Sequence, residues 1–158
     1  MISMKNCTGL TSMSKQQHGV SLLELMIVVA IVAIISSIAF PSYIQYVVNT
    51  KRAVATSALL QVADKQQQFF MDNKQFAADM TDLGYGADPL VLADNGRAVA
   101  AGDAEAVYSI SISNVAATSY TITAAPLHGQ ATRDTDCASL TLDEAGARGN
   151  SAGGSKCW

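Results

Sequence analysis

A run of 21 residues, from position 20 to position 40, holds one charged residue, Glu24, in the sequence VSLLELMIVVAIVAIISSIAF. At about 1.5 Å per residue, a helix of that length spans the bilayer core of about 30 Å. The run therefore predicts a membrane-spanning helix or a secretion signal. Hydrophobic residues make up 49% of the chain and charged residues 15%, which excludes an intrinsically disordered protein.

The residues before this run are polar and carry only positive charge. Residues 1–19 contain Lys5 and Lys15 and no Asp or Glu. Lysine next to a membrane span holds its flank in the cytoplasm. We therefore expect the N-terminus inside the cell and the C-terminal part across the membrane.

An ordinary cleavable signal peptide is one interpretation of this run. Its apolar region would be residues 25–35, and Ser37, Ile38 and Ala39 would form the cleavage site. Against this, Glu24 places a carboxylate in the apolar run, which costs about 2.5–3.5 kcal/mol at the membrane centre when unpaired. A paired Glu24 is one interpretation of this carboxylate. The alternative is a lone Glu24 whose side chain extends to the lipid headgroups.

The residues around the start of the run resemble the signature of the type IV pilin family. The matching sequence is Gly19-Val20-Ser21-Leu22-Leu23-Glu24, followed by the apolar run and Pro41. The resemblance implies that a prepilin peptidase cuts between Gly19 and Val20 and that Val20 is then N-methylated. The family usually has Phe where this chain has Val20. Met1, Met4 and Met13 remain alternative starts of the leader.

The resemblance also implies a role for Glu24 in assembly. Cleavage creates an α-amine on Val20, whose reference pKa is about 7.7–8.0. The Glu24 carboxylate of one subunit can pair with the Val20 amine of a neighbour in the apolar filament core, where an unpaired charge is costly. The partners implied are major and other minor pilins, the peptidase/methyltransferase, an inner-membrane assembly platform, and the membrane before assembly.

Helical spacing continues beyond Pro41, through residues 42–71, without Gly or Pro. We predict one helix from residue 20 to about residue 72, kinked at Pro41 because proline lacks an N–H and clashes with the preceding turn. The expected polar face includes Lys51, Arg52, Asp64 and Lys65, and the glutamines Gln66–Gln68 are expected to be solvated.

The rest of the chain predicts a small sheet. Residues 73–105 are loop-rich, with a short helical turn expected within 74–85, and alternation at period two then marks residues 107–113, 120–124 and 140–142. Three or four antiparallel strands with one face on the helix fit this pattern. The residues expected to face the helix are Tyr108, Ile110, Ile112, Tyr120, Ile122, Leu140 and Leu142.

The fold class is thus α+β, and the resemblance implies the pilin fold, in which a long N-terminal helix packs on a small antiparallel sheet. The predicted organisation is a cleaved leader (1–19), a transmembrane and filament-core half-helix (20–48) and a globular head (49–158). The head motifs also resemble PilE-type minor pilins: Phe69-Phe70, Phe76, Leu83-Gly84-Tyr85, residues 136–143, Gly146 and Cys157-Trp158.

Two cysteines, Cys137 and Cys157, remain after the leader removes Cys7. An even pair in an exported chain favours a disulfide over two free thiols. A bridge that closes a loop of this size stabilises by about 3 kcal/mol in the chain-entropy model. The Gly- and Ser-rich residues 149–155 lie between the two cysteines and have few apolar anchors.

No arrangement of residues predicts an enzyme, a cofactor or a metal site. After cleavage one histidine remains, His128, which is expected in a loop. The acidic residues Asp134, Asp136, Asp143 and Glu144 could ligate calcium but match no EF-hand spacing, and turns or helix N-caps are the other interpretation.

The predicted function is that of a minor pilin, a structural or priming subunit that supports pilus assembly, twitching motility, adhesion or DNA uptake. Two alternatives remain, a DNA-binding uptake receptor and a type II secretion pseudopilin. From residue 20 on, the chain has a net charge of −5, so DNA would need a local patch such as Arg133, Arg148 and Lys156. The expected location is the inner membrane, with the head in the periplasm, and then the extracellular pilus.

Overall fold

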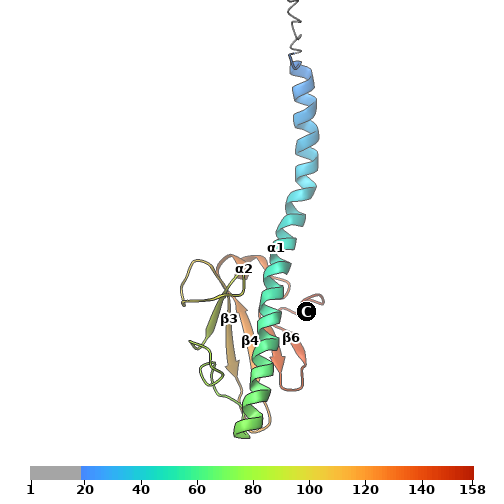
Figure 1. Cartoon of the computed structure of the whole chain (residues 1–158). Helices are drawn as coiled ribbons and strands as arrows, with labels where there is room; N and C mark the ends of the chain where they lie inside the picture. Colours follow the sequence, from blue (N-terminus) through green and yellow to red (C-terminus); the bar gives the residue numbers. More distant parts are fainter. Residues whose placement is uncertain (1–18) are drawn as a thin grey trace, which may run out of the picture. The chain divides into compact units, whose positions relative to one another are not determined.

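The computed structural model describes residues 19–158, which fall into two compact units (Figure 1). One unit ends at Phe40 and the other is Pro41–Trp158. Helix α1 (Leu22–Asn73) contributes residues to both units. Its two ends lie close to the predicted ones, residue 20 and about residue 72. The predicted leader before Gly19, with Lys5, Lys15 and Cys7, lies outside the described residues.

The first unit presents the apolar run as exposed helix. An 18-residue window of α1 has a mean hydropathy of 2.7 and no buried residue, so α1 is long and apolar enough to cross a membrane by length and composition. Glu24 lies in its first turn, and Pro41 lies inside the helix at the first position of the second unit. The kink at Pro41 stays a prediction.

The second unit is built on a six-stranded antiparallel sheet in the order β2-β1-β3-β4-β5-β6. The strands are β1 (Leu90–Ala93), β2 (Ala98–Val99), β3 (Ala106–Ser113), β4 (Thr121–Pro126), β5 (Leu140–Asp143) and β6 (Arg148–Asn150). A short helix, α2 (His128–Arg133), follows β4. Figure 1 shows the C-terminal half of α1 lying along the sheet.

One apolar cluster joins α1 to the sheet. It includes Leu59 and Val62 of α1 and six of the seven residues predicted to face the helix, while Ile112 packs against it half-buried. The register places Ile122 between Ile112 and Leu142 on neighbouring strands, so one face of the sheet is apolar across three strands. The α+β fold class and this inward-facing set are confirmed.

The sheet differs from the prediction of three or four strands. Strands β1 and β2 lie in the segment predicted to be loop-rich, and residues 74–85 form turns without a helix. All four residues of β1 are buried, so its sequence shows no alternation of apolar and polar residues. Strand β6 lacks strand-forming residues and is held by pairing with β5. His128 begins α2, so the prediction of a loop there was wrong.

The prediction that Gln66 is solvated was also wrong. Its side chain is fully buried, and its amide accepts a hydrogen bond from the Ala77 N–H at 2.9 Å and donates one to the Ala77 carbonyl at 3.0 Å. Ala77 lies outside any helix or strand, so its backbone has no regular partner and the Gln66 side chain replaces one. The neighbours Gln67 and Gln68 are exposed as expected.

Candidate functional site

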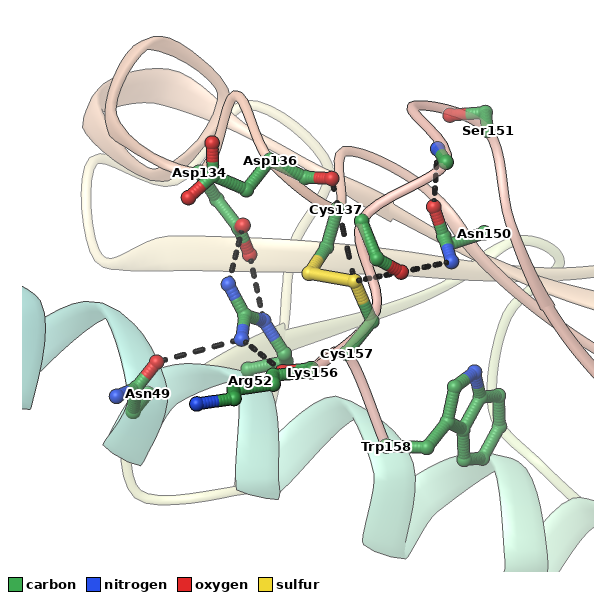
Figure 2. The surroundings of a disulfide bond; sticks show 12 residues. Asn49, Arg52, Asp134, Asp136, Cys137, Asn150, Ser151, Lys156, Cys157 and Trp158 are labelled. Atoms are coloured by element: carbon green, nitrogen blue, oxygen red, sulfur yellow. Dashed lines mark hydrogen bonds and ion pairs between the residues drawn. A yellow bond between two sulfur atoms is a disulfide. The ribbon is translucent and has the colours of Figure 1, made fainter.

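A buried ion pair joins α1 to the end of α2 (Figure 2). Arg52 donates from Nε to Asp134 Oδ2 at 3.1 Å and from Nη2 to Asp134 Oδ1 at 2.6 Å. The Asp134 side chain is fully buried and that of Arg52 is 11% exposed. Two parallel charge-assisted bonds fix both the position and the plane of the guanidinium. Arg52 was predicted on the polar face of the helix, which was wrong because its side chain is largely covered. Asp134 was predicted in a turn or as an N-cap, whereas it is the C-cap residue of α2 and its carboxylate lies in this buried pair.

Strand β3 and α2 complete the environment of the Asp134 carboxylate. Tyr108 donates from its hydroxyl to Asp134 Oδ2 at 3.1 Å, and Gln130 donates to the Tyr108 hydroxyl at 3.0 Å and to the Val48 carbonyl at 3.3 Å. Burial raises the pKa of Tyr108 to about 12, so its hydroxyl remains a proton donor at neutral pH. This network ties the sheet and both helices together beneath the surface.

The remaining Arg52 nitrogen contacts the C-terminal segment. Nη1 donates to the Lys156 carbonyl oxygen at 3.0 Å and to Asn49 Oδ1 at 3.3 Å. The hydrogen-bonded Asp134 carboxylate raises the pKa of the Arg52 guanidinium above its ordinary value. Arg52 is thus a fixed cation with acceptors on α1, on α2 and in the C-terminal segment.

A disulfide joins Cys137 and Cys157, whose Cα atoms are 5.5 Å apart (Figure 2). The loop between the two cysteines closes on itself, because the Gly154 N–H donates to the Asp136 carbonyl at 3.0 Å and Asn150 donates to the Gly154 carbonyl at 2.9 Å. A Cβ at Gly154 would overlap the Asp136 carbonyl oxygen, so this close approach requires glycine.

A polar groove of about 750 Å³ lies between α1 and this disulfide loop. It is lined by Gln45, Asn49, Arg52, Ala53, Thr56, Thr135, Asp136, Cys137, residues 152–156, Cys157 and Trp158. Trp158 donates from its indole nitrogen to the Gly149 carbonyl at 2.9 Å. The Arg148 guanidinium carbon lies 5.4 Å from the centre of the Trp158 ring, within the range of a cation–π contact.

The three cations suggested as a DNA patch are all exposed, but they do not share one groove. Lys156 lines the groove beside the disulfide, and Arg148 lines a smaller pocket that also contains Asp143 and Glu144. Arg133 is the last residue of α2 and lines neither of these two.

The acidic residues serve local structure. Asp143 Oδ1 accepts hydrogen bonds from the Ala145 and Ala147 N–H groups at 3.0 and 2.7 Å, which confirms the turn interpretation there. Glu144 Oε2 accepts from the Tyr120 N–H at 3.3 Å. Within residues 19–158, no three His, Cys, Asp or Glu side chains form a group that could hold a metal ion.

The predicted processing and assembly residues belong to the first unit. Gly19 and Val20 precede α1 and are exposed, and the Ser21 carbonyl just before the helix accepts a hydrogen bond from the Leu25 N–H at 3.1 Å. Glu24 lies in the first turn, where a negative charge is favoured by the helix dipole. Their roles in cleavage, methylation and assembly stay predictions.

Comparison with known proteins gives two family matches. Residues 41–141 match the family described as "Type IV minor pilin ComP, DNA uptake sequence receptor", and residues 14–40 match the "Prokaryotic N-terminal methylation motif". The first match covers well over half of the chain. This chain belongs to the ComP minor pilin family. The resemblance to PilE-type pilins is thus confirmed at the level of the family. The ComP match ends at residue 141, before β6 and Cys157.

Several individual pilins are also similar. The type IV major pilin protein PilA of Myxococcus xanthus is 30% identical over 46% of this chain and 33% of its own. A fimbrial protein of Pseudomonas aeruginosa is 31% identical over 49% of this chain and 54% of its own. The type IV major pilin protein PilE1 of Neisseria gonorrhoeae is 33% identical over 49% and 47%. The chain thus spans between a third and about half of the length of these relatives.

A solved type IV pilin from Shewanella oneidensis is 19% identical to this chain, with a TM-score of 0.43 over 68% of this chain and 92% of that one. The ComP family is one of structural proteins rather than enzymes.

Proposed function

We propose that this chain is a minor subunit of a type IV pilus and that its head binds DNA for uptake. The observation that carries the proposal is the pair of consecutive matches, the methylation motif over residues 14–40 and the ComP family over residues 41–141. The first is typical of a subunit that is processed and inserted into a filament. The ComP match favours a pilus subunit over a pseudopilin of type II secretion.

The first half of α1 supplies the means of assembly. We propose a leader (1–19) that a prepilin peptidase removes, a half-helix (20–48) that holds the chain in the inner membrane and later in the filament core, and a periplasmic head (49–158). The side chains of α1 before Pro41 are exposed, so they are available to lipid or to other pilins. The Val20 amine and the Glu24 carboxylate of a neighbouring subunit would pair in that apolar setting.

A DNA-binding head is the second element, and the family description favours it. The head as a whole is acidic, so DNA must meet a local group of cations. Lys156 is the best-placed candidate, because it is exposed at the rim of the polar groove and its backbone is tied to Arg52. Arg148 and Arg133 are exposed cations on β6 and α2 that can add phosphate contacts.

A clean deletion tests the pilus function. We expect the deletion to impair surface piliation, twitching or transformation, and wild-type chain supplied in trans to restore the lost phenotype. Normal piliation, motility and transformation together would contradict a role in the pilus. Loss of transformation with normal piliation would identify DNA uptake as the main output.

Binding of labelled host DNA to the full processed chain in detergent micelles tests the DNA function. We expect affinity to fall steeply with salt, because bound cations release counterions from the phosphates. Lys156→Ala should weaken binding, and Lys74→Gln, just beyond the C-terminal end of α1, is the matched loss of one positive charge. Equal binding by both variants and the wild type would contradict a contact between Lys156 and DNA.

A further inference from the structure

The peptide that precedes Cys157 is held by two independent ties. On one side, the Cys157 sulfur is bonded to Cys137. On the other, the Lys156 carbonyl oxygen accepts a hydrogen bond from Arg52 Nη1 at 3.0 Å (Figure 2). The chain on either side is also held, because the Gly154 N–H donates to the Asp136 carbonyl and the Trp158 indole donates to the Gly149 carbonyl. The bond from Arg52 acts on the Lys156 peptide itself, and it limits the rotation that the small residues at 151–155 otherwise allow.

The Arg52 side chain is rigid enough to serve as an anchor. Its other two donor nitrogens hold both oxygens of the buried Asp134 carboxylate at 3.1 and 2.6 Å. Asp134 is itself held by Tyr108 from strand β3. Guanidinium is planar, so fixing two of its nitrogens also fixes the direction in which Nη1 points.

The Lys156 side chain is free to act while its backbone is fixed. Lys156 is exposed, and no hydrogen bond or ion pair recorded among residues 19–158 uses its ammonium group. Arg52, by contrast, is largely covered and fully engaged, so it has little surface to offer a ligand directly. The two cations therefore have different roles.

We propose that Arg52 is the positioning residue for Lys156, holding the disulfide segment so that the Lys156 ammonium meets a DNA phosphate. The inference rests on the proposed DNA-binding function. It predicts that loss of the hydrogen bond from Arg52 to the Lys156 carbonyl weakens DNA binding as much as loss of the Lys156 side chain. Arg52 itself does not contact DNA.

A double-mutant cycle on the full processed chain in detergent micelles tests this, with labelled duplexes cut from host DNA. Lys156→Ala should weaken binding roughly five- to tenfold and lower the salt slope by about 1, the effect of losing one phosphate contact. Arg52→Lys keeps a positive charge beside Asp134 but lacks the planar fork, and it should produce the same loss. The double variant should bind no more weakly than either single variant.

Two further variants separate positioning from misfolding. Arg52→Gln combined with Asp134→Asn removes the tie without leaving a buried charge, and it should match Lys156→Ala in affinity and slope. Gln68→Ala changes an exposed polar side chain of α1 outside the groove and should bind like the wild type, within about twofold. Circular dichroism of each variant at the assay temperature checks that it is folded.

The outcomes are distinct. If the wild type shows no salt-dependent DNA binding, the proposed DNA function fails and this inference fails with it. If the wild type binds and both folded variants that lack the Arg52 tie bind equally well, only the inference is overturned. Additive losses in the Arg52→Lys/Lys156→Ala chain also overturn it, because they mean that Arg52 acts independently of Lys156.

Discussion

Arg52 and Asp134, 82 positions apart in the chain, form a bidentate ion pair whose carboxylate is completely buried. Through Asp134 the pair reaches Tyr108 in the sheet, and through Arg52 Nη1 it reaches the Lys156 carbonyl beside the disulfide. One polar network thus connects α1, α2, β3 and the C-terminal segment. Cys137 and Cys157 belong to the apolar core, and the network attaches the mostly exposed residues 151–156 between them to it.

Asp134→Ala should destabilise the head by about 3–5 kcal/mol, because it leaves the largely covered Arg52 charge without its partner. Urea unfolding of the compact unit, residues 41–158, measures the loss. Asp136→Ala removes a carboxylate two residues away that is exposed, and it should change stability by less than about 0.5 kcal/mol. Equal effects of the two substitutions would contradict a structural role for the buried pair.

Gln66→Leu should destabilise the same unit by about 2–4 kcal/mol, because both the N–H and the carbonyl of Ala77 lose their buried partner. Gln68→Leu is the matched change on the exposed side of α1 and should be close to neutral. The measurement is the shift of the urea midpoint at unchanged slope. A neutral Gln66→Leu would mean that water satisfies Ala77.

The sequence predicted the parts of the fold that depend on local periodicity. The bounds of α1 and the inward faces of β3, β4 and β5 follow from helical and alternating spacing. Strand β1 was missed because a fully buried four-residue strand has no alternation, and β6 because its sequence Arg-Gly-Asn has no strand propensity.

The buried polar network was not predictable from spacing. Arg52 and Asp134 each lie in a polar stretch where charged residues are usually solvated, and only the packing of α2 against α1 brings them together. Gln66 was missed for the same reason, since its partner lies in irregular chain eleven residues later. Tertiary contacts between distant segments have no local signature.

The stability of the head should fall as pH rises from about 10 to about 12. Burial raises the pKa of Tyr108 from an ordinary value of 10.0 to about 12, so the folded head holds the proton that the unfolded chain releases. This contribution is complete below pH 10 and is lost through about pH 12, and it amounts to about 2–3 kcal/mol. Thermal unfolding across this range checks it, and Tyr108→Phe should show a shallower decline. Equal slopes for both proteins would contradict the assignment.

Glu24→Ala should leave membrane insertion and leader cleavage intact, because it removes a charge from an apolar helix. It should nevertheless reduce entry into the filament, because the Val20 amine of a neighbouring subunit loses its partner. The ratio of processed protein in sheared pili to that in the inner membrane measures this entry. Glu24→Gln is the isosteric variant, which removes the charge and keeps the size of the side chain. A wild-type ratio for both variants would mean that the head alone recruits the subunit.

The most direct test of the pilin assignment is the mass of the mature N-terminus, measured on chain recovered from the membrane and from sheared pili. The account predicts a protein that begins at N-methyl-Val20, with Gly19 and everything before it removed. The methylation motif matched at residues 14–40 contains Gly19 and Val20 and supports this prediction. A chain that begins at Phe40 would mean cleavage by ordinary signal peptidase and would contradict the assignment to the pilus.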